Sequence, residues 1–460
     1  MTSTHLTETQ LRAAVERELP GVRADLARLV AIPSISFPEF DRANVRRSAE
    51  AVGQMLQDCG LTVQIVQSGD GQPAVIGVRP APPGAPTVLL YAHHDVQPIG
   101  EAARWHSDPF TVVERDGRLY GRGVADDKAG VMAHIAALRA FGDDLPVGVV
   151  VFAEGEEEYG SHTLADLLRE HRDTLAADVI VIADSGNWDV GVPALTTSLR
   201  GIVNLFVELR TLESAVHSGM FGGAVPDAVT SMCRLLATLH DESGDVAVAG
   251  LTRRHAAALE YPPQRLRAEA GMTEGTELIG TGPLVERLWT RPALSVLGID
   301  TPRTAEAPNA LVASARAKLS LRIAPGEDPK AAYEAVVAHL REHAPWGASV
   351  EVSLEADGAP CEIETTGPAY EAARAAFRAA WDGTEPVDIG VGGSIPFIAT
   401  FKEMFPQASI LVTGISDPQS KIHGPDESLD LREFGRICLA ETLLLNNLAT
   451  MSDRAGSMAA

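Results

Sequence analysis

The sequence predicts an α/β fold, in which a mainly parallel sheet with helices on its faces is interrupted by a smaller α+β insertion. Three apolar runs, "TVLLYAHHDV" (87–96), "GVVVFAEG" (148–155) and "DVIVIADSG" (178–186), alternate with helical stretches, as the strands of a parallel sheet do. From about residue 201, "GIVNLFVELR" and "ARAKLSLRIAP" instead alternate apolar and polar residues, which is typical of half-buried antiparallel strands.

The remaining elements follow the same division along the chain. The segment "DKAGVMAHIAALRAFG" has Val131, Ile135 and Leu138 at helical spacing and Gly142 at its end, which predicts a helix. The helical "PDAVTSMCRLLATLHD" and the strand-like "ASVEVSLEAD" fall in the insertion, whereas "GPAYEAARAAFRAAW" and "ASILVTG" return to the first pattern. We therefore expect one domain from residues 1–199 and 364–460 and an inserted domain over residues 200–363.

Length and composition restrict the class of protein. A chain of 460 residues exceeds what one core usually serves. A net charge of -24 disfavours nucleic acid and anionic membranes as partners, and no apolar run approaches the roughly 18 residues of a membrane span. The N-terminus mixes charges without the order of a signal peptide, and the four cysteines are far apart and form no CxxC pair. We expect a cytoplasmic protein with reduced thiols.

Histidines and carboxylates cluster where the apolar runs end. "HHD" (93–95) closes one run, "EEE" (156–158) a second and Asp184 a third, His423 follows the "ILVTG" strand, and Asp126 and Asp127 precede a helix. Ligands of open α/β sheets bind at the carboxyl ends of strands, so these groups should converge. Imidazole nitrogen and carboxylate oxygen together suit a divalent cation such as zinc or manganese.

The motifs "YAHHDVQP", "LYGRGVADDKAG", "EGEEEYGS", "IADSG", "VHSGMFGG", "GGSIPF" and "IHGPDE" resemble those of the M20 metallopeptidases, in that family's order and approximate spacing. The resemblance covers nearly the whole chain and is strongest to carnosinase-related and bacterial dipeptidases. It implies a zinc-peptidase-like catalytic domain that binds two divalent metal ions, and an inserted lid and dimerisation domain. Zinc is the first expectation for the ions, with manganese or cobalt as alternatives.

The resemblance also implies roles for residues. His93 and Asp184 match the ligands of one metal, Asp126 matches the carboxylate that bridges both, and Glu158 and His423 match the ligands of the other. Glu157 matches the general base and Asp95 the residue that orients His93. The peptide bond between Asp126 and Asp127 is expected to be cis. Glu157 and Glu158 can both face the site only if the strand has already ended, with "YGS" as the turn, and Glu156 is left as a solvent-facing turn residue.

In the insertion, His217 resembles the histidine that stabilises the oxyanion in the partner subunit's site, which implies a homodimer formed through the lid domain. Arg322 resembles the arginine that binds the C-terminal carboxylate of the substrate. Asn309, Gly393 and Ser394 match further substrate contacts.

The same metal centre is compatible with more than one class of substrate. The resemblance implies a dipeptidase that cleaves small dipeptides with a free C-terminal carboxylate, through a metal-bridging hydroxide. A deacylase or desuccinylase of N-acyl amino acids would use the same metal centre, and a binding protein without turnover would not need Glu157. Gly390 and Val391 replace the Arg-Glu pair that carnosinase-like dipeptidases commonly carry, and this neutral pair removes charge near the end of the substrate.

Overall fold

The computed structural model describes residues 6–256, 258–393 and 396–458. It divides into two compact units. The first unit comprises Met1–Thr197, Ile363–Ile389 and Thr400–Ala460, and the second comprises Ser198–Glu362 and Gly390–Ala399. We expected residues 200–363 for the insertion; the second unit takes Gly390–Ala399 in addition.

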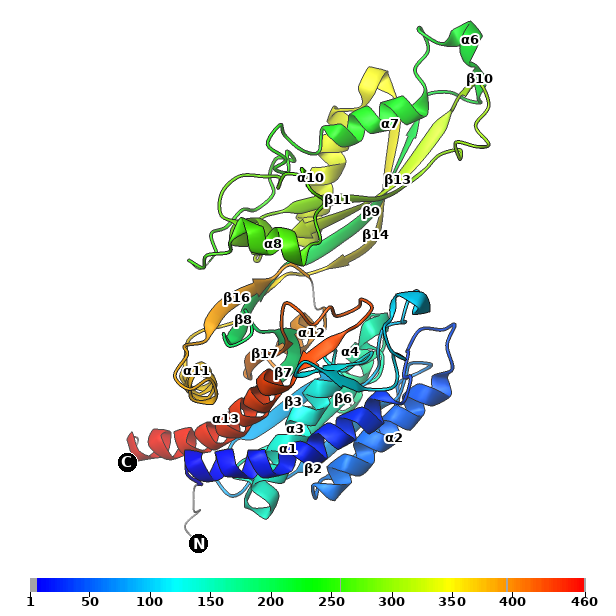
Figure 1. Cartoon of the computed structure of the whole chain (residues 1–460). Coiled ribbons are helices and arrows are strands. Elements are labelled where there is room, and N and C mark those ends of the chain that lie inside the picture. The colour runs from blue at the N-terminus through cyan, green and yellow to red at the C-terminus, as the bar shows by residue number, and fades with distance from the viewer. Residues whose placement is uncertain (1–5, 257, 394–395, 459–460) are drawn as a thin grey trace. The chain divides into compact units, whose positions relative to one another are not determined.

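A nine-stranded mixed sheet forms the centre of the first unit (Figure 1). Its order is β1-β2-β6-β3-β7-β17-β8-β15, with β16 beside β8. The four inner strands β6, β3, β7 and β17 are parallel to one another, whereas the pairs β1-β2, β2-β6, β17-β8 and β8-β15 are antiparallel. The strands span β1 (Thr62–Val66), β2 (Ala74–Arg79), β3 (Thr87–His93), β6 (Gly148–Glu154), β7 (Val179–Gly186), β8 (Ala194–Leu199), β15 (Cys361–Glu362), β16 (Val387–Val391) and β17 (Ser409–Ser416). The predicted α/β class with a mainly parallel sheet is therefore confirmed, with antiparallel flanks.

Continuous burial explains why the inner strands are apolar throughout. All seven residues of β6 are buried, and only the first residue of β3 is not. Val88 and Leu90 face the main helical core, while Tyr91 on the other face contacts the rings of Phe152 and Phe401. A strand that is covered on both faces carries no alternating pattern, as in other parallel sheets.

Helices α1, α3 and α13 pack side by side on one face of this sheet (Figure 1). The helix predicted over residues 127–142 is α3, and its C-cap Gly142 has a positive φ of 56°, a conformation that favours glycine. The helices that include residues of this unit are α1 (Glu8–Val30), α2 (Arg42–Asp58), α3 (Lys128–Phe141), α4 (Leu164–Glu170), α5 (Arg172–Leu175), α11 (Pro368–Ala380), α12 (Pro396–Met404) and α13 (Leu431–Met458). The four cysteines are free thiols, as predicted.

A small three-stranded sheet joins two distant parts of the first unit. It has the order β18-β5-β4, from Ser428–Asp430, Arg118–Tyr120 and Val113–Arg115. Its pairing of Ser428 with Tyr120 brings the loop before β18 next to the loop after β5. These two loops carry His423 and Asp126, respectively.

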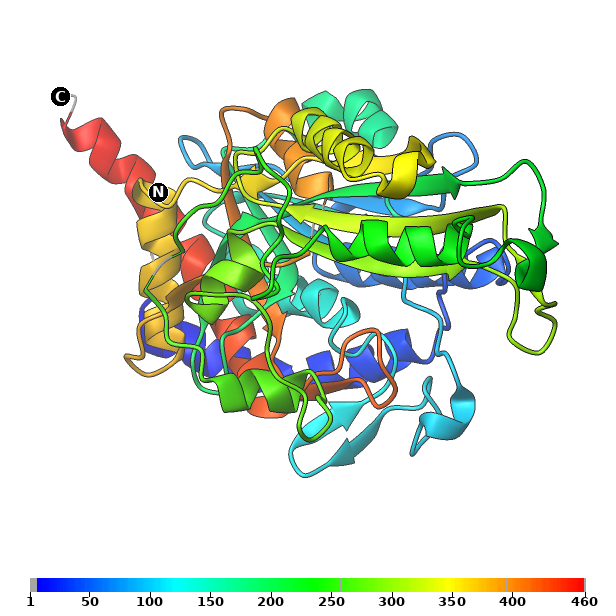
Figure 2. The same cartoon turned by 90° about the horizontal axis from the view of Figure 1, so that it is seen from above.

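The second unit has a four-stranded antiparallel sheet with two helices on one face (Figures 1 and 2). Along β9, buried and partly buried residues alternate, and its buried side chains pack against α7 and α10, as expected for a sheet with one covered face. The elements are β9 (Gly201–Arg210), β10 (Val216–His217), α6 (Ser218–Phe221), α7 (Ala228–Ala237), α8 (Pro263–Glu269), α9 (Leu284–Trp289), β11 (Ala293–Asp300), β12 (Ala310–Leu311), β13 (Ser314–Ile323), α10 (Pro329–Glu342) and β14 (Ser349–Gly358). Within the described residues, no helix combines the length and the apolar composition that crossing a membrane requires.

Candidate metal centre

The predicted ligands of the first unit converge at the carboxyl ends of neighbouring strands. His93 ends β3, Glu157 and Glu158 lie in the 3-10 turn after β6, and Asp184 lies near the end of β7. These three strands are adjacent and parallel in the order β6-β3-β7. The turn begins after β6 ends at Glu154, so the expected end of the strand before the two glutamates is confirmed.

Asp126 lies between the two histidines. Its Oδ1 is 3.1 Å from His93 Nε2, and its Oδ2 is 2.9 Å from His423 Nε2. The same nitrogen of His423 is 3.1 Å from Glu158 Oε2. One carboxylate therefore presents each oxygen to a different imidazole, which is the arrangement that a bridging ligand between two ions requires.

The donor atoms fit divalent ions. Ligand atoms of His93, Asp126 and Glu158 lie within 4.8 Å of one another, and so do those of His93, Glu157 and Asp184. This mixture of nitrogen and oxygen donors suits zinc and similar metals. Glu157, for which we predicted proton transfer, thus lies in the same group of donor atoms as His93 and Asp184.

Burial and mutual repulsion perturb the acids of this cluster. Burial raises the pKa of Glu157 and of Asp184 well above the usual range, and neighbouring carboxylates raise both pKa values further. Burial also opposes ionisation of Asp126, yet hydrogen bonds from His423 and His93 hold its pKa below the usual range. Several buried carboxylates in one place need compensating positive charge, which bound cations would supply.

Asp95 connects His93 to the glutamate turn. The Nδ1 atom of His93 lies 3.1 Å from the backbone oxygen of Asp95 and 3.4 Å from its carboxylate. The Asp95 carboxylate also accepts hydrogen bonds from the backbone N–H groups of Glu157 and Glu158, at 3.2 and 3.1 Å. Asp95 thus contacts both the histidine that we expected it to orient and the backbone of the turn.

Asp127 and His94, which follow the proposed ligands Asp126 and His93 in the chain, contact different parts of the first unit. The peptide bond between Asp126 and Asp127 is cis, as predicted, and Asp127 accepts a hydrogen bond from the His93 N–H at 3.2 Å. His94 points away from the cluster, as expected, and its Nε2 lies 3.0 Å from the Pro73 oxygen.

The expectation that Glu156 is a solvent-facing turn residue is wrong. Its side chain is buried and accepts hydrogen bonds from the backbone N–H of Gln72 and from both the N–H and the hydroxyl of Thr163. Its carboxylate ties the glutamate turn to two other loops. No spacing rule in the sequence marks this role, because both partners lie outside the motif.

Sequence reasoning also missed residues that hold the ligands. Gln97 donates from its side chain to Glu158 Oε2 at 2.8 Å and from its backbone to Glu158 Oε1 at 3.1 Å. Arg122 and Glu427 form a buried ion pair of 2.7 Å beside the cluster. All three lie inside the motifs "YAHHDVQP", "LYGRGVADDKAG" and "IHGPDE", which was the available signal.

In the second unit, His217 and Asn309 lie side by side. His217 pairs with Ala310 across the two short strands β10 and β12, and the N–H of Ser218 donates to the Asn309 oxygen at 3.1 Å. His217 is exposed, and its Nδ1 accepts a hydrogen bond from the Gly219 N–H at 3.0 Å.

Arg322 lies on β13, and burial lowers its pKa. Burial and the charge of Arg322 lower the pKa of Arg200 to about 10, so sequence reasoning missed a second arginine in this region. Arg200 donates to the Gly392 oxygen at 3.1 Å, directly before Gly393. The predicted contact Ser394 lies outside the described residues.

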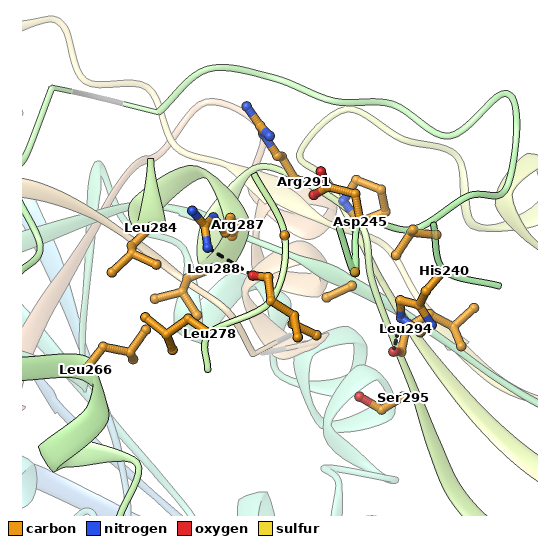
Figure 3. Close-up of a pocket in the computed structure, with 16 residues that line it drawn as sticks. His240, Asp245, Leu266, Leu278, Leu284, Arg287, Leu288, Arg291, Leu294 and Ser295 are labelled. Carbon is orange, nitrogen blue, oxygen red and sulfur yellow. Dashed lines mark hydrogen bonds between the residues drawn. The ribbon is translucent and has the colours of Figure 1, made fainter. Parts of the chain in front are cut away.

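A cavity of about 250 Å³ in the second unit contains none of the predicted site residues (Figure 3). Its lining includes leucines of α8, α9 and β11 together with Arg287 and Arg291. Arg287 donates to backbone oxygens of the loop at residues 279–282, and Arg291 pairs with Glu286. Both arginines therefore form their hydrogen bonds and ion pairs with other residues of the second unit.

A mixed α/β sheet that gathers imidazoles and carboxylates at its carboxyl edge, together with an inserted α+β unit, has the features of a metal-dependent hydrolase. Residues 89–446 match the model of peptidase family M20/M25/M40. The chain therefore belongs to this family.

Individual relatives agree with this assignment. The cysteinylglycine-S-conjugate dipeptidase of Corynebacterium striatum is 37% identical, over 89% of this chain and 91% of that protein. The Beta-Ala-His dipeptidase of Rattus norvegicus is 30% identical, over 88% of each chain. The crystal structure of human carnosine dipeptidase 1 is 27% identical and matches with a TM-score of 0.79, covering 96% of this chain and 99% of that one.

Proposed function

We propose that this protein is a two-metal dipeptidase that hydrolyses the amide bond of small dipeptides with a free C-terminal carboxylate. The observation that carries the proposal is the position of Asp126, whose two oxygens face His93 and His423 separately. His93 and Asp184 would hold one ion and Glu158 and His423 the other, with zinc as the expected metal and manganese or cobalt as alternatives. Two bound ions supply Lewis acidity and lower the pKa of water.

Glu157 is the proposed proton carrier. Its carboxylate is 3.9 Å from His93 Nε2, and burial raises its pKa well above the usual range. A carboxylate in this position can accept a proton from the attacking water and then deliver it to the leaving amine. Asp95 holds the Glu157 backbone in place for this transfer.

His217 is the proposed donor to the developing oxyanion. Because its Nδ1 accepts a hydrogen bond from Gly219, the proton of the neutral ring must be on Nε2. The ring therefore presents an N–H donor, which is what stabilisation of an oxyanion requires.

The proposed carboxylate site is in the second unit. Arg322 is the anchor that we predicted, and its charge is close enough to lower the pKa of Arg200. Two neighbouring cations favour an anionic ligand. Gly393, Ser394 and Asn309 remain proposed contacts of the same substrate.

Gly390 has a structural reason to be glycine in this chain. A Cβ atom there would meet the side chain of Trp289 at 2.6 Å, so an arginine would not fit without movement of the tryptophan. The neutral Gly390 and Val391 leave less charge near the substrate than the Arg-Glu pair would.

Hydrolysis of a matched panel tests the substrate class. The panel contains unblocked dipeptides and their N-acetyl, N-succinyl and C-amidated counterparts, assayed with metal-stripped protein reloaded with zinc or manganese. We expect cleavage of the unblocked members with a free carboxylate, as the names of the two dipeptidase relatives suggest. Preference for N-acyl members would instead make the protein a deacylase.

The Glu157→Ala variant tests the proton carrier. We expect a loss of hydrolysis of about 10³-fold, since general base catalysis contributes roughly 10² to 10⁴, while the metal content measured by atomic emission stays at the wild-type value. Hydrolysis at the wild-type rate would remove Glu157 from the mechanism, and loss of an ion would make it a ligand.

A further inference from the structure

Glu427 is buried and accepts four hydrogen bonds from the segment that carries Asp126. Its Oε2 accepts from Arg122 Nη1 at 2.7 Å and from the Gly123 N–H at 2.9 Å. Its Oε1 accepts from the N–H groups of Ala125 and Asp126, at 2.9 and 3.0 Å. The carboxylate therefore fixes the backbone up to Asp126 itself.

Arg122 extends the same contact to two further segments. Its Nη2 donates to the oxygens of Pro98 and Gly424, both at 3.3 Å. Pro98 follows the segment of His93 and Asp95, and Gly424 follows His423 directly. The buried pair thus contacts three of the segments that supply proposed metal ligands.

The loop of His423 needs such support. Lys421, His423 and Asp426 have positive φ values of 50°, 61° and 57°, in the left-handed region that side chains disfavour. Such conformations persist where surrounding contacts determine them. Gly424 and Glu427, both bound to Arg122, supply these contacts directly after His423.

We propose that the Arg122–Glu427 pair is the positioning device of the metal centre, because it holds His423 and Asp126 at the separation that a shared ion needs. This inference rests on the proposed two-metal function. Neither Arg122 nor Glu427 is in the candidate ligand groups, so both are positioning residues. The effect of the pair should be greatest for the ion that His423 and Glu158 bind, since the pair contacts the segments of both His423 and the shared Asp126.

The Glu427→Gln variant tests the proposal. The amide replaces one acceptor oxygen by an NH₂ group, which faces backbone donors that it cannot satisfy. We expect wild-type protein, stripped of metal and titrated calorimetrically with zinc alone, to bind two equivalents. In the variant one equivalent should bind 10- to 100-fold more weakly, as is typical when a residue that orients a ligand is lost, and the other should weaken much less.

Glu433→Gln is the matched control. Glu433 is also a buried glutamate paired with an arginine, Arg436 at 2.8 Å, but its other partner is Trp381 rather than a metal-ligand loop. We expect this variant to lose stability in urea without any change in the affinity of either equivalent. A merely structural role for Glu427 would give the same result as this control.

The Arg122→Lys variant is a second, independent test in case the Glu427→Gln variant does not fold. It keeps a positive charge opposite Glu427 but removes the planar fork that reaches Pro98 and Gly424. The same zinc equivalent should bind more weakly to this variant than to the wild-type protein. Wild-type affinities in both variants, or equal weakening of both equivalents, would overturn the positioning role. A wild-type chain that binds fewer than two ions would overturn the two-metal function itself, and the inference with it.

Discussion

Three adjacent glutamates differ in role because the chain turns between them. Glu156 faces Gln72 and Thr163, Glu158 faces His423 and Gln97, and Glu157 lies near His93. In an extended strand the first and third would share a face. The 3-10 turn that begins at Glu157 breaks that pattern and separates the supporting carboxylate of Glu156 from the two carboxylates that face the candidate metal centre.

His94 makes stability depend on pH. Burial lowers its pKa to about 4, whereas an unfolded histidine titrates near 6.5. As the pH falls from about 6.5 to about 4, the unfolded chain binds a proton that the folded chain does not, so this stabilisation is present above 6.5 and lost on acidification. The contribution is on the order of 3 kcal/mol.

Urea unfolding of metal-stripped protein between pH 7 and pH 4.5 measures this effect. His94→Gln is the comparison, because glutamine can donate to the Pro73 oxygen as His94 does but does not titrate. The free energy of unfolding of wild-type protein should fall more steeply than that of the variant. Parallel slopes would mean that His94 keeps an ordinary pKa in the folded chain.

At the scale of elements, the two edges of the second unit's sheet differ in character. The edge strand β11 exposes Val296, Leu297 and Ile299, at 42%, 57% and 43%. The opposite edge strand, β14, exposes Leu354 among glutamates. Charged side chains protect an edge from pairing, and exposed apolar ones invite it. If two copies of this chain form the homodimer that the family resemblance implies, we expect them to pair through the edge strand β11.

Lysines on β11 test this interface. The double variant Leu297→Lys and Ile299→Lys should sediment as a monomer, because two buried ammonium groups would face their symmetry mates across a twofold axis. Its zinc content should not change, since the proposed ligands are in the first unit. Leu354→Lys on β14 is the control and should remain dimeric. A double variant that still sediments as a dimer would place the interface elsewhere.

At the scale of the whole molecule, the sequence predicted the features that depend on residues close together in the chain. Apolar runs identified the inner strands, and strand-end residues such as His93 and Asp184 converge because parallel strands share an edge. The contact of Arg122 with Glu427 joins residues 305 positions apart and depends on the pairing of β5 with β18. Each of these strands has three residues, too few for a periodic pattern to be recognised. The burial of Glu156 could not be predicted because its partners, Gln72 and Thr163, lie outside its motif.

The proposed catalytic residues lie in different units, so an experiment can test whether one chain forms a complete active site by itself. Glu157 belongs to the first unit, and His217 belongs to the second, where it is exposed on the short strand β10. If His217 serves the site of the partner subunit, as the family resemblance implies, then each active site needs residues from two chains. Chains that carry His217→Ala and chains that carry Glu157→Ala should each be nearly inactive alone.

Mixing the two inactive variants should restore part of the activity. In a mixed dimer, the His217→Ala chain keeps Glu157 and receives His217 from its partner, while the other site lacks both residues. Random exchange at equal amounts makes half of the dimers mixed, so about one site in four is complete, and the rate should reach roughly a quarter of the wild-type rate. Exchange is verified by co-purification of differently tagged chains. No recovery despite exchange would show that each chain uses its own histidine, because every site in the mixture would then lack one of the two residues.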